Sequence, residues 1–145
     1  MNRPADGVPA QIDPDRLALG VQQPWAELIL RGIKTLEIRS RPTRVRGPIY
    51  LYASRRISAL PAAKIAAQRY GIDVDELPRG LLVGSVNISD CRPATSRDVA
   101  AACLPAELLI DCQGWHLEHA NRWSPALPVR FLPYGVWFYP FRRRP

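Results

Sequence analysis

One segment decides the fold of this 145-residue chain: QPWAELILRGIKTLEIRS, residues 23–40. Its first half is typical of a short amphipathic helix, because Trp25, Leu28 and Ile29 recur at the i, i+3, i+4 spacing of one helical face. Gly32 follows at a position where a left-handed glycine commonly ends a helix. The second half, 34–39, has the composition of a strand. The segment therefore predicts a helix, a turn and a strand in succession.

Three charged side chains, Lys34, Glu37 and Arg39, lie in this predicted strand. Since side chains alternate between the two faces of an ideal strand, Lys34 and Glu37 should point apart. The two side chains can line one pocket only if the chain bends near Thr35, or if Lys34 lies in the turn after the helix and not in the strand. A carboxylate held between two cations stays ionised and accepts hydrogen bonds from a base or a ribose hydroxyl. The alternative is a surface salt bridge on an edge strand.

The same segment carries a family resemblance. The pattern G-x-K-x-x-E-x-R, preceded by Q-P-W-A-x-L-I, resembles the signature of ASCH domains, which belong to the PUA-like superfamily. Later blocks agree in the same order, at 46–54, 77–86, 115–120 and 134–137, so the resemblance runs from about Leu17 to Phe138. Tyr52 departs from it, because many members have histidine there. The resemblance implies an α+β fold, a small and mostly antiparallel PUA-like β-barrel with flanking helices.

Length and composition fit one domain of this kind, because 145 residues are enough to bury one core. We expect a flexible N-terminal tail at 1–15 and the ASCH/PUA-like domain at 16–145. No apolar run is long enough to span a bilayer, and the first residues lack a signal peptide, so no membrane association is predicted. The three cysteines favour reduced thiols in a cytoplasmic protein over a disulfide framework.

Apolar runs and turn residues predict the elements along the chain. We expect strands at 17–21, 34–39, 48–54, 81–88, 115–119, 129–132 and 136–141. We expect helices at 24–31, 58–70 and 95–102, and single helical turns at 73–77 and 105–110. The run at 81–88 is strongly β-prone, and we therefore place it at the centre of the sheet.

Positive charge points to a nucleic-acid partner. Lysine and arginine number 20 against 13 acidic residues, a net charge of +7. The arginines cluster at positions 39, 41, 44 and 46, at 55–56, and at 142–144. Arginine suits bidentate contact with phosphate and stacking on bases, so we expect an arginine-rich rim around the charged segment. The alternative is a basic surface that only keeps the protein soluble, in a chain rich in alanine, proline and arginine.

The predicted nucleic-acid-binding residues are Gln23, Trp25, Lys34, Glu37, Arg39, Ser40, Arg44, Arg46, Ser54 and Arg55. Trp25 has two interpretations: a core residue, or a platform for a nucleobase, a contact that contributes about 1–3 kcal/mol. Cys112, His116 and His119 lack a fourth ligand, so no metal site is predicted. The chain has no phosphate-binding glycine loop or dinucleotide fingerprint, and no cofactor is predicted.

We predict that the protein binds RNA, or another single-stranded nucleic acid or nucleotide. Binding would use a charged cleft that recognises a base or a phosphate. The resemblance adds an enzymatic alternative. Some minimal ASCH-type proteins are N4-acylcytidine amidohydrolases, in which a lysine at the position of Lys34 acts with a threonine and a glutamate. Glu37 takes the place of that threonine here, which argues against the same reaction. Two more functions stay open: a ribonuclease, with Lys34 and Glu37 as the catalytic acid–base pair, and a protein-interaction domain.

Overall fold

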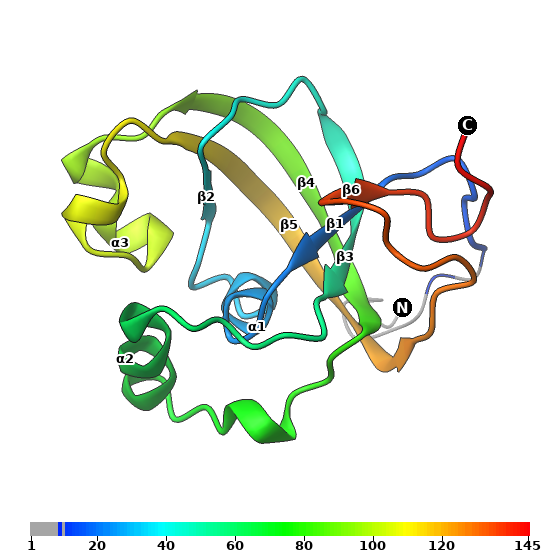
Figure 1. The fold of residues 1–145 in the computed structure, drawn as a ribbon, viewed down its shortest axis with the longest axis horizontal. Coiled ribbons are helices and arrows are strands. Elements are labelled where there is room, and N and C mark those ends of the chain that lie inside the picture. The colour runs from blue at the N-terminus through cyan, green and yellow to red at the C-terminus, as the bar shows by residue number, and fades with distance from the viewer. Residues whose placement is uncertain (1–8, 10) are drawn as a thin grey trace, which may run out of the picture.

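The computed structural model describes residues 9 and 11–145; residues 1–8 and 10, most of the predicted tail, lie outside it. Figure 1 shows a strongly curled sheet with its helices gathered at one side. The strands are β1 (Ala18–Val21), β2 (Leu36–Arg39), β3 (Gly47–Ala53), β4 (Leu81–Pro93), β5 (Gln113–Leu127) and β6 (Trp137–Phe138). The helices are α1 (Trp25–Leu30), α2 (Pro61–Arg69) and α3 (Val99–Ala102), with single 3₁₀ turns at Val74–Glu76, Ser96–Asp98 and Ala106–Leu108.

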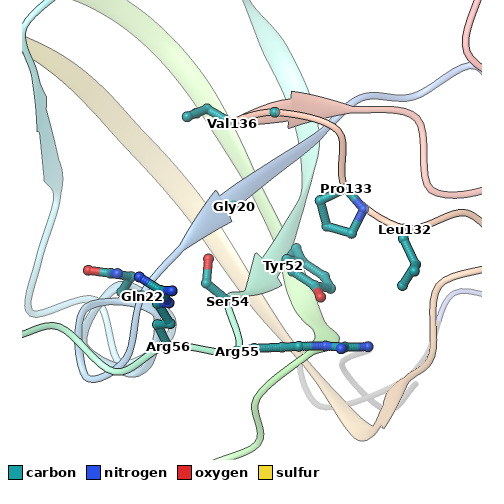
Figure 2. Close-up of a pocket in the computed structure, with 10 residues that line it drawn as sticks. Gly20, Gln22, Tyr52, Ser54, Arg55, Arg56, Leu132, Pro133 and Val136 are labelled. Carbon is teal, nitrogen blue, oxygen red and sulfur yellow. The ribbon is translucent and has the colours of Figure 1, made fainter.

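The strands form one sheet in the order β2-β5-β4-β3-β1-β6. Neighbouring strands are antiparallel except β1 and β3, which run parallel and place Gly20 opposite Tyr52 (Figure 2). The β4–β5 ladder contains several register shifts, and such bulges bend a strand and increase its twist. The predicted α+β fold with a mostly antiparallel PUA-like barrel is confirmed, and the barrel is open.

Two predicted C-terminal strands differ in the structure. The segment 129–132 is not a strand, because the amides of Arg130 and Phe131 both donate to the carbonyl of Pro140 at 3.0 Å instead of joining a ladder. A proline on either side of this segment has no N–H to donate. The predicted strand 136–141 is reduced to the two residues of β6, since proline interrupts a β-ladder. Strands β4 and β5 are longer than predicted.

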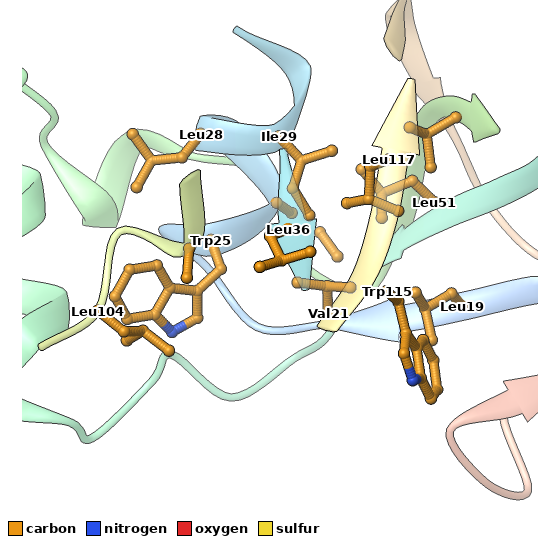
Figure 3. Close-up of a cluster of buried hydrophobic side chains, with 14 of the residues drawn as sticks. Leu19, Val21, Trp25, Leu28, Ile29, Leu36, Leu51, Leu104, Trp115 and Leu117 are labelled. Atoms are coloured by element: carbon orange, nitrogen blue, oxygen red, sulfur yellow. The ribbon is translucent and has the colours of Figure 1, made fainter. Parts of the chain in front are cut away.

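Helix α1 packs against the curled sheet through the face that its spacing predicts. Trp25, Leu28 and Ile29 are all buried in one cluster with strand residues (Figure 3). Each large apolar side chain that is fully buried stabilises the fold by about 1.5–3 kcal/mol. Gly84 of β4 lies opposite the helix, and a Cβ there would collide with the carbonyl oxygen of Asn121 on β5. Only glycine therefore allows these two strands to approach so closely.

Two buried polar side chains fix α1 in place. The Glu27 carboxylate accepts hydrogen bonds from Arg31 at 2.7 Å and from both terminal nitrogens of Arg122 at 2.8 and 2.9 Å. Burial alone would raise the pKa of Glu27, but the hydrogen bonds and charges of the two arginines outweigh it and hold the pKa below its usual value. Gln23 accepts a hydrogen bond from the Glu27 amide at 2.9 Å and donates one to the carbonyl of Pro78 at 3.1 Å.

The last residues of the predicted tail contact the barrel. The Tyr50 hydroxyl accepts a hydrogen bond from the Asp13 amide at 2.8 Å and donates one to the Asp13 carbonyl at 3.0 Å. Asp15 forms an ion pair of 2.8 Å with Arg142. These contacts place the described start of the chain beside its C-terminal segment (Figure 1).

Two further findings concern the whole described chain. No helix within residues 9 and 11–145 is long and apolar enough to cross a bilayer. The three cysteines, Cys91, Cys103 and Cys112, are free thiols.

Candidate nucleic-acid interface

The charged ends of Lys34, Glu37 and Arg39 converge beside β2. One oxygen of Glu37 accepts hydrogen bonds from Arg39 Nε at 2.9 Å and Nη2 at 2.6 Å, and its other oxygen lies 3.8 Å from Lys34 Nζ. Lys34 precedes the strand and lies in the turn after α1, where its amide donates to the carbonyl of Leu28 at 3.1 Å. Of the two arrangements that the spacing allows, the structure therefore has the one with Lys34 in the turn.

Lys34 is buried beneath this pair and exposes only 2% of its surface. Its ammonium donates to the carbonyl of Ala102 at 2.6 Å and lies 5.2 Å from the centre of the Trp25 ring. Burial lowers the pKa of Lys34, and the Glu37 carboxylate opposes this shift only in part. A carbonyl, a carboxylate and the face of an indole are all groups that attract a cation. We infer that the buried Lys34 ammonium holds the Glu37 carboxylate in position.

A cleft of about 430 Å³ opens beside the Glu37–Arg39 pair, where β1, β2, the end of β3 and α1 meet. Its aromatic, charged and hydroxyl-bearing lining residues are Trp25, Glu37, Arg39, Ser54 and Ser58. The Arg39 guanidinium also donates to the carbonyl of Gly20 at 2.9 Å. Because β2 and β1 are not neighbours in the sheet, this hydrogen bond crosses the opening of the barrel.

The Trp115 ring also contacts the Arg39 side chain. Its guanidinium carbon lies 5.6 Å from the centre of the Trp115 ring, and Trp115 stacks on Trp137 with 5.7 Å between the ring centres. About a quarter of the Arg39 side chain, 24%, remains exposed. The guanidinium is thus fixed in orientation by Glu37, Gly20 and Trp115 while part of it faces solvent.

The predicted site residues divide into three groups. Trp25, Glu37, Arg39 and Ser54 line the cleft. Lys34 and Gln23 are buried and do not line it; Gln23 has no exposed surface, and both ends of its amide are bonded within the protein. Gln23 is therefore a structural residue in this conformation and does not offer its amide to a base. Ser40, Arg44, Arg46 and Arg55 are exposed and also lie outside the cleft lining.

The expected arginine-rich rim is divided between the two ends of β3. Arg44 and Arg46 precede this strand, whereas Arg55 follows it. The seven residues of β3 span roughly 20 Å at the usual rise per residue. Arg46 donates to the carbonyls of Thr43 and Val45, both at 2.9 Å, within its own loop. Since Ser54 lines the cleft, Arg55 belongs to the end of β3 that is next to it.

A second pocket of about 450 Å³ adjoins the cleft and was not expected from the sequence (Figure 2). Its polar lining residues are Gln22, Tyr52, Ser54, Arg55 and Arg56, and Gly20 lines both pockets. One signal in the sequence points to it. Tyr52 and Ser54 are two residues apart in a predicted strand, a spacing that places both side chains on one face.

The histidines and cysteines do not gather into a metal centre. Within residues 9 and 11–145, no group of three or more histidine, cysteine, aspartate or glutamate side chains is arranged to hold a metal ion. His119 is exposed, and the Nδ1 atom of His116 lies 3.4 Å from a guanidinium nitrogen of Arg92. The described residues therefore offer no candidate metal site.

A comparison with protein family models identifies the family of this chain. A family model described as the ASCH domain matches residues 19–134, which include all the polar residues that line the cleft. The chain belongs to the ASCH domain family. Activating signal cointegrator 1 is 38% identical to it over 82 residues in Homo sapiens and over 80 residues in Mus musculus. These matches cover 50% of this chain and 14% of either relative, so this ASCH protein corresponds to a small part of those proteins.

Solved ASCH structures share the fold. The crystal structure of ASCH from Zymomonas mobilis has a TM-score of 0.58 and 16% identity, with 88% of both chains covered. A tyrosine-to-phenylalanine mutant of that protein has a TM-score of 0.57 and 14% identity, with 86% of this chain and 88% of the other covered. At these identities the likeness establishes the fold of this ASCH protein.

Proposed function

We propose that this ASCH domain binds single-stranded RNA and takes an unpaired nucleotide into the cleft beside Glu37 and Arg39. The observation that carries the proposal is the fixed orientation of this pair at the lining of a cleft of about 430 Å³. Ligand pockets commonly have volumes of about 300–1,000 Å³, so the volume of this cleft is suitable for a nucleotide. A carboxylate and a guanidinium side by side offer an acceptor and donors to the edge of one base.

Each lining residue has a separate task in this proposal. Glu37 accepts a hydrogen bond from an exocyclic amine, and the exposed part of Arg39 donates to a carbonyl oxygen or a phosphate. Trp25 contributes apolar surface at the lining, although its ring is mostly buried. Lys34 orients Glu37 from below. The hydroxyls of Ser54 and Ser58 suit ribose or phosphate.

The net charge of the chain and its membership of the ASCH family also support the proposal. The chain carries a net charge of +7, and a basic protein attracts the phosphate backbone without regard to sequence. Association with nucleic acid is also typical of the ASCH family. The specific partners, RNA, another single-stranded nucleic acid or a modified nucleoside, belong to the proposal. Three free thiols favour a reducing compartment, and we include the cytoplasm in the proposal on that ground.

Arg39→Gln tests the proposal by RNA binding. We expect fluorescence anisotropy with a labelled single-stranded oligonucleotide to show binding that weakens by roughly ten- to a hundredfold, because a charge-assisted contact contributes about 1.5–3 kcal/mol. The matched control is Arg97→Gln, an exposed arginine of the Ser96–Asp98 turn that lines neither pocket. Circular dichroism would establish that both variants fold. Equal affinities for the wild type, Arg39→Gln and Arg97→Gln would contradict a cleft-centred site.

Hydrolysis of an acylated nucleoside is the second candidate, and one observation favours it: burial lowers the pKa of Lys34, as a general base requires. Two others oppose it, since Lys34 exposes only 2% of its surface and its nitrogen donates to the carbonyl of Ala102. We therefore expect the wild-type protein to leave N4-acetylcytidine intact. Acetate release by the wild type that Lys34→Ala abolishes would make the domain a hydrolase. RNA cleavage with the same dependence on Lys34 would make it a ribonuclease.

A further inference from the structure

The second pocket shares a wall with the cleft. Gly20, Gln22, Ser54 and Val136 line both, so one ligand can contact the two pockets at once. Gly20, which has no side chain, lies at this shared wall. A Cβ at that position would lie 3.5 Å from the Ser54 hydroxyl oxygen and 4.0 Å from the Tyr52 ring, which is ordinary contact distance. The two pockets together form a groove along the ends of β1 and β3.

Tyr52 brings a hydroxyl group to this groove. Its side chain is buried, with 3% exposed, and its ring packs edge-on against Phe138 with 5.2 Å between the ring centres. Among the hydrogen bonds of residues 9 and 11–145, none involves the Tyr52 hydroxyl, and its oxygen is not among the fully buried polar atoms without a partner, so it stays accessible at the pocket. In Figure 2 this hydroxyl points toward the side chain of Arg55. The Ser54 hydroxyl, also without a partner in the described chain, faces Gly20.

Arg55 and Arg56 add positive charge to the pocket lining, with the Arg55 side chain on the side of Tyr52 and the Arg56 side chain beside Gln22 (Figure 2). Both are exposed, and no ion pair within the described residues involves either guanidinium. Arg79 adds a third cation nearby, because its guanidinium donates to the backbone carbonyl of Arg55 at 3.2 Å. The described residues that line the pocket include no carboxylate. Two guanidinium groups and two hydroxyls, in a lining that has no carboxylate among its described residues, make a set of donors suited to an anion.

The opposite wall of the pocket is apolar. Leu132, Pro133 and Val136 form it, and Leu132 and Val136 are among the exposed large hydrophobic side chains. A free inorganic anion makes no favourable contact with apolar side chains. In a phosphate ester, the sugar packs against the apolar side chains while the phosphate accepts hydrogen bonds from the donors. The lining thus favours a phosphate ester over a simple ion.

We infer that this pocket, formed by Tyr52, Ser54, Arg55 and Arg56, is a phosphate subsite for the nucleotide whose base occupies the cleft. The inference rests on the proposed function and adds the ligand class: a nucleotide with its phosphate, either a terminal monoester or an internal diester. The base lies beside Glu37 and Arg39, the sugar passes Gly20, and the phosphate accepts hydrogen bonds from the hydroxyls and guanidinium groups. Phosphate contacts of this kind set the register of a nucleic acid on a protein.

The test compares ligands with and without phosphate. NMR titration of the isotope-labelled protein would give affinities for the four ribonucleosides, their 5′-monophosphates, dinucleotides and inorganic phosphate. We expect the preferred monophosphate or dinucleotide to bind about tenfold more tightly than its nucleoside, as one or more charge-assisted hydrogen bonds provide. A monophosphate advantage identifies a terminal phosphate as the source, and a dinucleotide advantage identifies a phosphodiester.

Two variants test whether the added affinity of phosphate-bearing ligands comes from this pocket. Tyr52→Phe removes one hydroxyl and keeps the ring against Phe138, so it should weaken phosphate-bearing ligands roughly three- to tenfold and leave nucleosides unchanged. Arg55→Gln with Arg56→Gln should remove most of the remaining advantage. The control, Lys64→Gln with Arg97→Gln, removes two exposed charges outside both pockets and should change nothing.

The outcomes separate this inference from the proposed function. If nucleosides bind and phosphate adds no affinity, or if Tyr52→Phe affects both ligand types equally, the phosphate subsite is wrong and the cleft remains. If no nucleoside, nucleotide or RNA binds but inorganic phosphate binds in a manner that depends on Tyr52, the nucleotide assignment fails and only the pocket's preference for an anion survives. Absence of all binding overturns both.

Discussion

Replacing Glu37 with glutamine tests whether the buried Lys34 is held as an ammonium. Lys34 exposes 2% of its surface and Glu37 exposes 6%. Removing one partner of a buried ion pair destabilises a protein by about 3–5 kcal/mol, because the other charge is left uncompensated. Arg39 is partly exposed and keeps its hydrogen bond to Gly20, so the loss falls mainly on Lys34. Release of the lysine proton limits the loss, and we therefore expect the lower end, about 3 kcal/mol.

Urea unfolding at pH 7 measures this loss directly. A change of about 3 kcal/mol should also lower Tm by roughly 6–12 °C in a domain of this size. The double variant Lys34→Met with Glu37→Gln should recover at least about 1 kcal/mol, because a methionine in place of the lysine leaves no buried charge. If Glu37→Gln loses less than about 1 kcal/mol and the double variant recovers nothing, Lys34 is neutral in the native protein and its assigned role is wrong.

Two further predictions concern pH and the basic loop. Because burial lowers the pKa of Lys34 below its ordinary 10.5, the unfolded chain binds more protons between the folded pKa and 10.5. The free energy of unfolding of the wild type, relative to Lys34→Met, should therefore rise with pH across that window in urea titrations; a difference that is flat or falls would contradict a lowered pKa. Replacing Arg44 and Arg46 together with alanine should weaken all RNA sequences about equally and reduce the salt dependence of binding. Wild-type binding by this double variant in a salt titration would make the loop only a basic surface.

Local patterns account for the parts of the structure that the sequence predicted. Helix α1 follows from its spacing of apolar residues, and it ends where Gly32 takes a φ of +75°. The second helix likewise ends before Gly71, which has a φ of +64°. The turn at Thr95 forms the capping box that its sequence indicates. In each case the residues that decide the conformation lie within about two turns of one another.

Contacts between distant residues account for what the sequence did not predict. The buried position of Gln23 depends on Pro78, which is 55 positions away. The orientation of Arg39 depends on Gly20, 19 positions earlier, through a hydrogen bond across the open side of the barrel. Spacing along the chain contains neither contact, because each joins segments that come together only in the folded barrel.

A crystal structure of the ASCH domain with a short single-stranded oligonucleotide tests the central claim most directly. Phosphate and base contacts are distinguished by position in such a structure. We predict one base in the cleft within hydrogen-bond distance of Glu37 or Arg39, and a phosphate in the adjoining pocket near Tyr52 and Arg55. An oligonucleotide bound only along the 40–46 loop, with the cleft empty, would contradict it.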